Sequence, residues 1–279
     1  MPNRGAFIVI EGLDRSGKST QAARLKERLA SDGTKVELMK FPDRTTAIGK
    51  MIDAYLRTNI EMDDHVVHLL YSANRWELAS RISTLLAEGT TIICDRYAFS
   101  GIAFSASKVA STSSSTASTS TSSTSTSSIA SSASQPSALN PAASTSTPAQ
   151  PASTSAGSTS ASLLPYAWCR APDIGLPAPD VTLFFDIAPE AARARGGYGE
   201  ERYEREDVQR RVMEVYARLG AEMEAARPGS WVRVDAARAV EEVAGAVWGV
   251  VGPLVGGGGH EGARGVEGEV GRLWEGELA

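Results

Sequence analysis

Short apolar runs alternate with longer amphipathic segments along most of the chain. Each run is rich in β-branched and aromatic residues and has the length of a buried strand. The runs lie at residues 6–10, 35–41, 90–94, 181–187 and 231–234. The segments between them, such as 19–32, 64–88 and 204–226, carry apolar side chains at helical spacing. This alternation predicts an α/β fold with a five-stranded parallel sheet flanked by helices.

Residues 111–162 interrupt the alternation. They contain no charged residue and consist largely of serine, threonine, alanine and proline. Such a segment cannot bury enough apolar surface to offset its backbone entropy, so we expect a disordered insertion. The rest forms a single domain from 1–110 and 163–255, and the glycine-rich start of 256–279 predicts a flexible C-terminal tail. A phosphorylated or O-glycosylated regulatory tether is the alternative interpretation of the insertion.

The amino-acid composition limits the classes of ligand and partner to be expected. The 279 residues are 42% hydrophobic, enough for one core, and the net charge of -5 argues against extensive nucleic-acid binding. Two cysteines give no sign of a disulfide scaffold and fit a reducing compartment, so we expect a cytoplasmic location, with the nucleus as a further one. The N-terminus leads directly into the first strand, and no apolar stretch is long enough to span a bilayer. We therefore expect small anions as ligands, and neither nucleic acid nor membrane as a partner.

The loop after the first predicted strand has the spacing G-x-x-x-x-G-K-[ST] and lies between a strand and a helix. Its residues are Gly12, Leu13, Asp14, Arg15, Ser16, Gly17, Lys18 and Ser19, followed by Thr20. Small residues allow the backbone to turn so that successive N–H groups point at phosphate oxygens. Lys18 can then reach the terminal phosphates, and Ser19 can supply a Mg²⁺ ligand. The loop predicts binding of a nucleotide.

Further polar clusters follow the other predicted strands, at the edge where ligands of parallel sheets gather. Phosphoryl transfer requires two positioned substrates and neutralised charge. Arg44 and Arg96 could hold an acceptor phosphate by paired hydrogen bonds, and Arg15 is placed to act as an arginine finger. Asp95 could act through the magnesium shell. For each residue alone, a solvated position or a structural ion pair remains the alternative.

Tyr71 and Arg75 lie four residues apart on the predicted helix 64–88 and therefore share a face. An aromatic ring and a guanidinium on one face can stack on a nucleobase and hydrogen-bond its edge. The alternative is a tyrosine packed in the core beside an exposed arginine.

Four motifs together resemble eukaryotic thymidylate kinases. They occupy residues 11–21, 41–44, 95–101 and 172–177, and the resemblance extends from residue 5 to about 251 apart from the insertion. It implies a P-loop nucleoside-monophosphate kinase fold and a homodimer. It also implies transfer of the γ-phosphoryl group of MgATP to dTMP, giving dTDP and ADP in dTTP synthesis. Residues 12–20 would then bind ATP, with Arg15, Lys18, Asp14 and Asp95 as the catalytic group and Ser19 and Asp95 at the metal.

The resemblance also implies a set of acceptor-binding residues, namely Phe41, Arg44, Tyr71, Arg75, Arg96, Phe104, Tyr203 and Gln209. In that family the matching residues have separate tasks. Asp14 would lie near the sugar, Phe41 and Tyr71 would frame thymine, and Arg75 would face its edge. Phe104 would crowd the sugar against a ribose hydroxyl. Tyr71 departs from the family pattern, in which phenylalanine is common.

The glycine-containing segment 195–203 is expected to move as a lid over the acceptor. Tyr203 and Gln209 would close over the acceptor from that side. Because Arg15 occupies the P-loop, we expect the lid arginines Arg193, Arg195 and Arg202 to assist binding rather than to act as the sole catalytic arginines. Another P-loop nucleoside-monophosphate kinase and, from a different class, a non-catalytic nucleotide-binding scaffold are the alternatives. A GTPase switch would need an N-K-x-D segment, and none occurs.

Deletion of residues 111–162 should leave soluble protein with nearly unchanged catalysis, because long loops add little closure entropy. The measurement is the yield of folded protein and the Michaelis constant for the acceptor, compared with the full chain. Loss of soluble protein, or a many-fold higher Michaelis constant, would show that the insertion does more than connect.

Overall fold

The computed structural model describes residues 4–108, 164–195, 203, 205–255 and 266–276. All of them belong to one compact unit, formed by Met1–Val109 and Ser162–Ala279. The predicted insertion lies outside the described residues, as does most of the lid segment.

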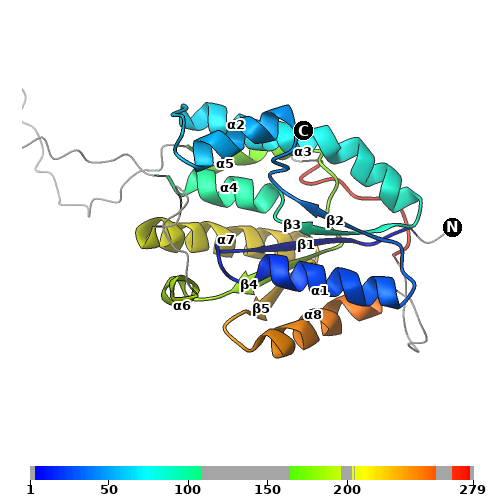
Figure 1. Cartoon of the computed structure of the whole chain (residues 1–279). Coiled ribbons are helices and arrows are strands. Elements are labelled where there is room, and N and C mark those ends of the chain that lie inside the picture. Colours follow the sequence, from blue (N-terminus) through cyan, green and yellow to red (C-terminus); the bar gives the residue numbers. More distant parts are fainter. Residues whose placement is uncertain (1–3, 109–163, 196–202, 204, 256–265, 277–279) are drawn as a thin grey trace, which may run out of the picture. The chain divides into compact units, whose positions relative to one another are not determined.

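The centre of this unit is a five-stranded sheet in which neighbouring strands are parallel. Its strands are β1 (Phe7–Gly12), β2 (Val36–Lys40), β3 (Thr91–Asp95), β4 (Val181–Asp186) and β5 (Trp231–Asp235), in the order β2-β3-β1-β4-β5 (Figure 1). The predicted five-stranded parallel sheet is confirmed, with strand ends shifted by no more than two residues. Because β1 is central, the loop that follows it lies between the ends of β3 and β4.

Helices connect the strands. They are α1 (Lys18–Ser31), α2 (Ala47–Leu56), α3 (Asp64–Ala87), α4 (Ala98–Ala106), α5 (Tyr166–Arg170), the 3₁₀ helix η1 (Ala171–Asp173), α6 (Pro189–Ala194), α7 (Glu206–Ala226) and α8 (Val240–Val255). The sequence pattern named α1, α3 and α7 to within two residues of their ends. It did not name the short helix α4, whose residues are nearly all buried, because it has no polar face to reveal a helical period.

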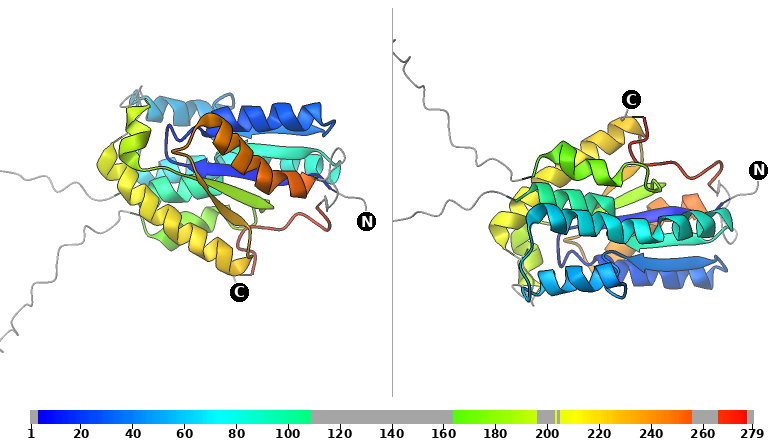
Figure 2. Two further views of the ribbon diagram at one scale, coloured as in Figure 1. Left: turned by 90° about the horizontal axis from the view of Figure 1, so that it is seen from below. Right: turned by 90° about the horizontal axis from the view of Figure 1, so that it is seen from above.

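Side chains of β1 alternate between two apolar clusters, so both faces of the sheet are covered. Phe7 and Val9 pack in one cluster with residues of α3, α4 and α7, whereas Ile8 and Ile10 pack in the other with α1 and α8. Figure 2 shows the two faces in turn, with α8 in front in one view and α3 and α4 in front in the other. This continuous burial explains why the strand is apolar at every position from 7 to 10.

The described part of the C-terminal tail, residues 266–276, packs on the domain. Leu273 is buried, and its backbone hydrogen-bonds to Gly175 and Leu176. This differs from the flexible tail expected from sequence. The glycines and glutamates that suggested flexibility surround a short Leu273–Trp274 pair, too brief to produce a periodic pattern.

None of the helices in the described ranges is both long and apolar enough to cross a membrane.

Candidate functional site

The predicted phosphate loop lines a cavity of about 570 Å³ at the carboxyl end of β1. Its walls include every residue from Asp14 to Gln21, together with Asp95, Arg195 and the 236–240 segment after β5. Gly12 and Leu13 come just before these wall residues, where the chain turns from β1 into the loop. A Cβ on Gly12 would lie 2.6 Å from the carbonyl oxygen of Phe185, and its φ of 139° is unfavourable for other residues, so only glycine fits here.

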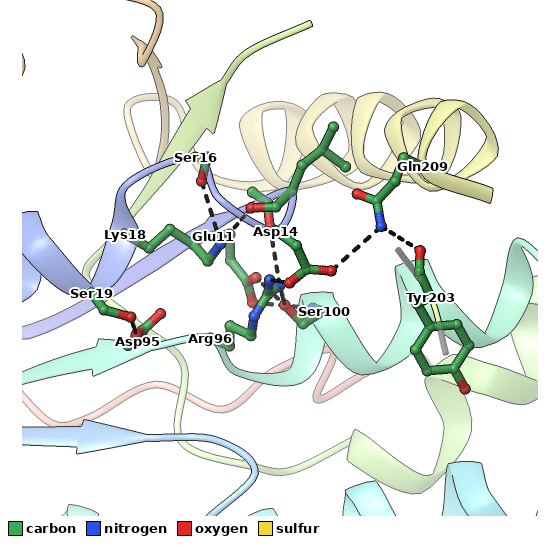
Figure 3. Close-up of polar contacts among 12 residues, drawn as sticks. Glu11, Asp14, Ser16, Lys18, Ser19, Asp95, Arg96, Ser100, Tyr203 and Gln209 are labelled. Carbon is green, nitrogen blue, oxygen red and sulfur yellow. Dashed lines mark hydrogen bonds and ion pairs between the residues drawn. The ribbon is translucent and has the colours of Figure 1, made fainter. Parts of the chain in front are cut away.

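Lys18 projects back over this loop. Its Nζ donates hydrogen bonds to the Leu13 carbonyl at 2.5 Å and to the Ser16 hydroxyl at 3.3 Å (Figure 3). Burial, and then the positive charge of Arg96, lower the pKa of Lys18 to about 7, although Asp14, Asp95 and Glu11 oppose the shift. The amine is therefore poised to gain a proton when an anion enters the cavity.

Ser19 and Asp95 meet on the other side of the loop and have the chemistry of a magnesium site. The Ser19 hydroxyl donates to Asp95 Oδ2, while Asp95 Oδ1 is buried with no hydrogen-bond partner (Figure 3). An unpartnered buried carboxylate oxygen beside a hydroxyl suits Mg²⁺, which takes few protein ligands and completes its shell with water and phosphate oxygens. Among the residues described, no larger cluster of acidic, histidine or cysteine side chains could hold a metal.

A second cavity, of about 240 Å³, opens next to the first. The predicted acceptor residues that line it are Phe41, Arg44, Tyr71, Arg75, Arg96, Phe104 and Tyr203. The two cavities have in common Asp14, Arg15, Lys40 and Arg96. The structure therefore brings most of the predicted acceptor residues together and joins them to the phosphate loop through shared side chains.

Arg96 is the best-fixed side chain at this junction. Its guanidinium pairs with Asp14 and donates at 3.0 Å to both the Gly12 carbonyl and the Ser100 hydroxyl (Figure 3). Burial alone would lower the pKa of Arg96, but the negative charges around it, Asp14 first and then Asp95 and Glu11, together outweigh burial and raise that pKa. Conversely, burial would raise the pKa of Asp14, and the charges of Arg96 and Lys18 keep it below its usual range. Both groups are thus charged.

The other predicted arginines of this cavity have carboxylate partners. Arg44 donates to Asp53 at 2.7 Å and is about one-third exposed. Arg75 is buried and pairs with Asp173 through Nε and NH2, at 3.1 and 2.7 Å. The alternative interpretation, in which Arg75 is exposed, is therefore wrong. Tyr71 lines the cavity and also packs against the apolar cluster that contains Tyr55.

Gln209 lies beside the cavity and not in its wall. Its amide donates to the Tyr203 carbonyl at 2.7 Å and to Asp14 at 3.4 Å, so it links the lid side of the site to the phosphate loop (Figure 3). Among the lid arginines, Arg195 lines the first cavity and donates to the Arg15 and Ala236 carbonyls. Arg193 lies away from both cavities, 3.8 Å from Glu206. Arg202 lies outside the described residues.

Glu11 is a residue of the site that the sequence analysis did not single out. Its carboxylate is fully buried and accepts hydrogen bonds from the Tyr97 and Ser100 backbone N–H groups, at 2.9 and 3.1 Å. It also accepts from the hydroxyls of Ser100 and Tyr216. Glu11 thus fixes the start of α4, which carries the Ser100 hydroxyl that Arg96 contacts. The available signal was an acid placed at the end of an otherwise apolar strand.

The chain is similar to thymidylate kinases over most of its length. The family model described as thymidylate kinase matches residues 10–122 and 155–247. The thymidylate kinase of Arabidopsis thaliana is 41% identical over 86% of this chain and 68% of its own length. The Schizosaccharomyces pombe enzyme is 40% identical over 86% of this chain and 89% of its own length. The human enzyme is 35% identical over 86% of this chain and 86% of its own length. The solved Candida albicans thymidylate kinase superposes with a TM-score of 0.69 at 30% identity, covering 98% of this chain and all of that one.

Binding of MgATP at pH 8 should take up about one proton per molecule, because the triphosphate raises the pKa of Lys18 from about 7. At pH 6 the uptake should nearly vanish, since the free amine is already charged. Calorimetric titration in buffers of different ionisation enthalpy measures it. Lys18→Arg, which keeps its proton, is the control and should show no uptake at pH 8. Binding heats of the unaltered protein that do not depend on the buffer at pH 8 would contradict the lowered pKa.

Proposed function

Because the chain belongs to the thymidylate kinase family, and transfers the γ-phosphoryl group of ATP to dTMP in dTTP synthesis, we propose how its residues divide that reaction between them. The observation that carries the proposal is that Asp14, Arg15 and Arg96 line both cavities at once. Two phosphate groups placed in these cavities would meet at those side chains. Residues at the junction can therefore act on the group in transit, and the others on one substrate only.

The first cavity is assigned to ATP, held by residues 12–20. Lys18 contacts the terminal phosphates, and backbone N–H groups of the loop surround them. Ser19 and Asp95 would hold Mg²⁺, whose charge, when bound, screens the phosphate oxygens. Arg195, next to the Arg15 carbonyl, assists ATP binding, as Arg193 and Arg202 would after lid closure.

The second cavity is assigned to dTMP. Arg96 and Arg44 hold its phosphate, since planar guanidiniums pair well with phosphate oxygens. Phe41 and Tyr71 frame the thymine, whose edge Arg75 faces. Support for this arrangement is that all five side chains line one cavity.

The sugar lies between the phosphate and base ends. Asp14 binds near the sugar, and Phe104 crowds the position of a ribose hydroxyl. Tyr203 and Gln209 close over the acceptor. This assignment is supported by the hydrogen bonds of Gln209 to both Tyr203 and Asp14, which would tie closure to the phosphate loop. Arg15 stabilises the charge that develops on the transferring group.

We also propose that the enzyme is a homodimer that works in the cytoplasm and the nucleus. Val66, Leu69 and Trp76 lie on one face of α3 and are 46%, 47% and 42% exposed. An apolar face of this kind is covered well by a second copy of the same helix. The location is supported by Cys94 and Cys169, which are both free thiols.

Arg15→Ala should lower kcat about 10- to 1000-fold while the Kd for ATP changes much less, because an arginine finger acts mainly on the transition state. Single-turnover kinetics and equilibrium ATP binding give the two quantities. Arg210→Ala, which removes an exposed arginine from α7, is the matched control and should change neither. A loss of ATP affinity as large as the loss of turnover would remove the finger from the mechanism.

Leu69→Glu should convert a dimer into monomers, since a charge in an apolar interface costs several kcal/mol. Sedimentation velocity over a range of concentrations measures the change. Val240→Glu is the control, because Val240 is similarly exposed (44%) but lies at the start of α8. A dimer that persists in the Leu69 variant would place the interface elsewhere, and a monomeric unaltered protein would reject the dimer.

A further inference from the structure

The described C-terminal residues pack against the acceptor side of the domain. Leu273 is 1% exposed and belongs to the apolar cluster that contains Phe41 and Tyr97 of the second cavity. The ring of Trp274 meets the ring of Phe99 edge-on, with centroids 5.9 Å apart. Phe99 lies on α4, directly before the cavity-lining residues Ser100 and Gly101.

A short backbone ladder joins this segment to the chain that follows η1. Gly175 donates to the Leu273 carbonyl at 2.9 Å, and Leu273 donates to the Leu176 carbonyl at 2.8 Å. Two residues further along each segment, the Ala178 N–H donates to the Gly271 carbonyl at 2.8 Å. Residues 271–274, which we call the C-terminal strap, therefore fix residues 175–178 in one register.

Asp173 lies two residues before the segment that the strap holds. The Leu176 N–H donates to the Asp173 carbonyl at 3.2 Å, so the ladder and the acid are directly connected. The Asp173 carboxylate is completely buried and holds Arg75 through two hydrogen bonds, while the Ser72 hydroxyl donates to it at 2.7 Å. A displaced Asp173 would leave a buried guanidinium with no counter-charge.

Arg75 has little freedom apart from this contact. A Cβ on Gly101 would lie 2.7 Å from its NH1, so the guanidinium lies against α4 on one side and Asp173 on another. The strap therefore contacts α4, through Phe99, and the residues that directly follow η1, through its backbone hydrogen bonds.

We propose that Leu273 and Trp274 are positioning residues for acceptor recognition: the strap holds Asp173 and α4 so that Arg75 faces the nucleobase at the correct distance. This inference rests on the proposed assignment of Arg75 to the thymine edge. Thymine presents a 4-oxo acceptor where cytosine presents an amino donor. A guanidinium held in place therefore favours dTMP over dCMP, and a loosened one discriminates less.

The test compares Leu273→Ala with Leu29→Ala in the full chain. Both remove the same atoms from leucines that are 1% exposed, but Leu29 lies on α1 in the cluster on the opposite face of the sheet. Both variants should lower Tm. Only Leu273→Ala should raise KM for dTMP, by about tenfold, and lower the dTMP to dCMP preference by a similar factor, with KM for ATP unchanged. Equal effects of the two variants on KM and preference would reduce the strap to a stabilising contact and overturn the inference.

Two further variants keep the test decisive. Trp274→Ala removes a partly exposed side chain and should fold even if Leu273→Ala does not, with the same change in KM and base preference. Arg75→Lys should lower the dTMP to dCMP preference by itself and abolish the additional effect of Leu273→Ala on it. If Arg75→Lys leaves the preference intact, the assignment of Arg75 to the base fails. If it lowers the preference but adds independently to Leu273→Ala, the assignment stands and the strap does not act through Arg75.

Discussion

The crowding of several cationic side chains around one small space is the constraint on which the rest of this site depends. Lys18, Arg15 and Arg96 border the same space before any phosphate is present. Burial, and after it the charge of Arg96, lowers the pKa of Lys18, and the carboxylate of Asp14, paired with Arg96, opposes that shift. Arg15 and Arg96 already border the space that the anions enter, and Lys18 gains its proton as they arrive. Little rearrangement of side chains is then needed, which is the condition for strong electrostatic stabilisation of a transition state.

Both of these arginines also have unfavourable backbone conformations. Arg15 and Arg96 both have left-handed conformations, with φ of 62° and 72°, although neither is glycine. Such a conformation costs about 1 to 2 kcal/mol per residue and persists only where surrounding contacts determine it. At Arg96 those contacts include the backbone hydrogen bond to the Ile10 carbonyl and the side-chain bonds to Gly12 and Ser100. The hydrogen bond to β1 thus helps to hold the Arg96 guanidinium in place.

Sequence reasoning reached the sheet and the phosphate loop because each has a local signature, whereas several residues of the second cavity were named only through the resemblance to thymidylate kinases. Apolar runs reveal buried strands, and the loop spacing reflects the geometry of a phosphate. For Glu11 the only local signal was an acid at the end of an apolar strand, and for Asp173 and the strap no local pattern showed which residues they contact. Their importance comes from partners about 85 to 100 residues away or more, as in the bonds of Glu11 to Ser100 and of Arg75 to Asp173. Burial of a charge becomes informative only when its distant partner is known.

The strand order has a consequence for how the chain is synthesised. The central strand β1 needs β3 on one side and β4 on the other, and β4 is encoded after the insertion. Roughly 50 extra residues in the connection raise the entropic free-energy cost of pairing β1 with β4 by only about 0.3 kcal/mol. Synthesis of these residues takes about 3 to 10 s, and during that time one edge of β1 is unpaired, as in the exposed strand edges that promote aggregation. Residues 111–162 therefore add little to the free-energy cost of this pairing but lengthen the interval in which β1 lacks its second partner.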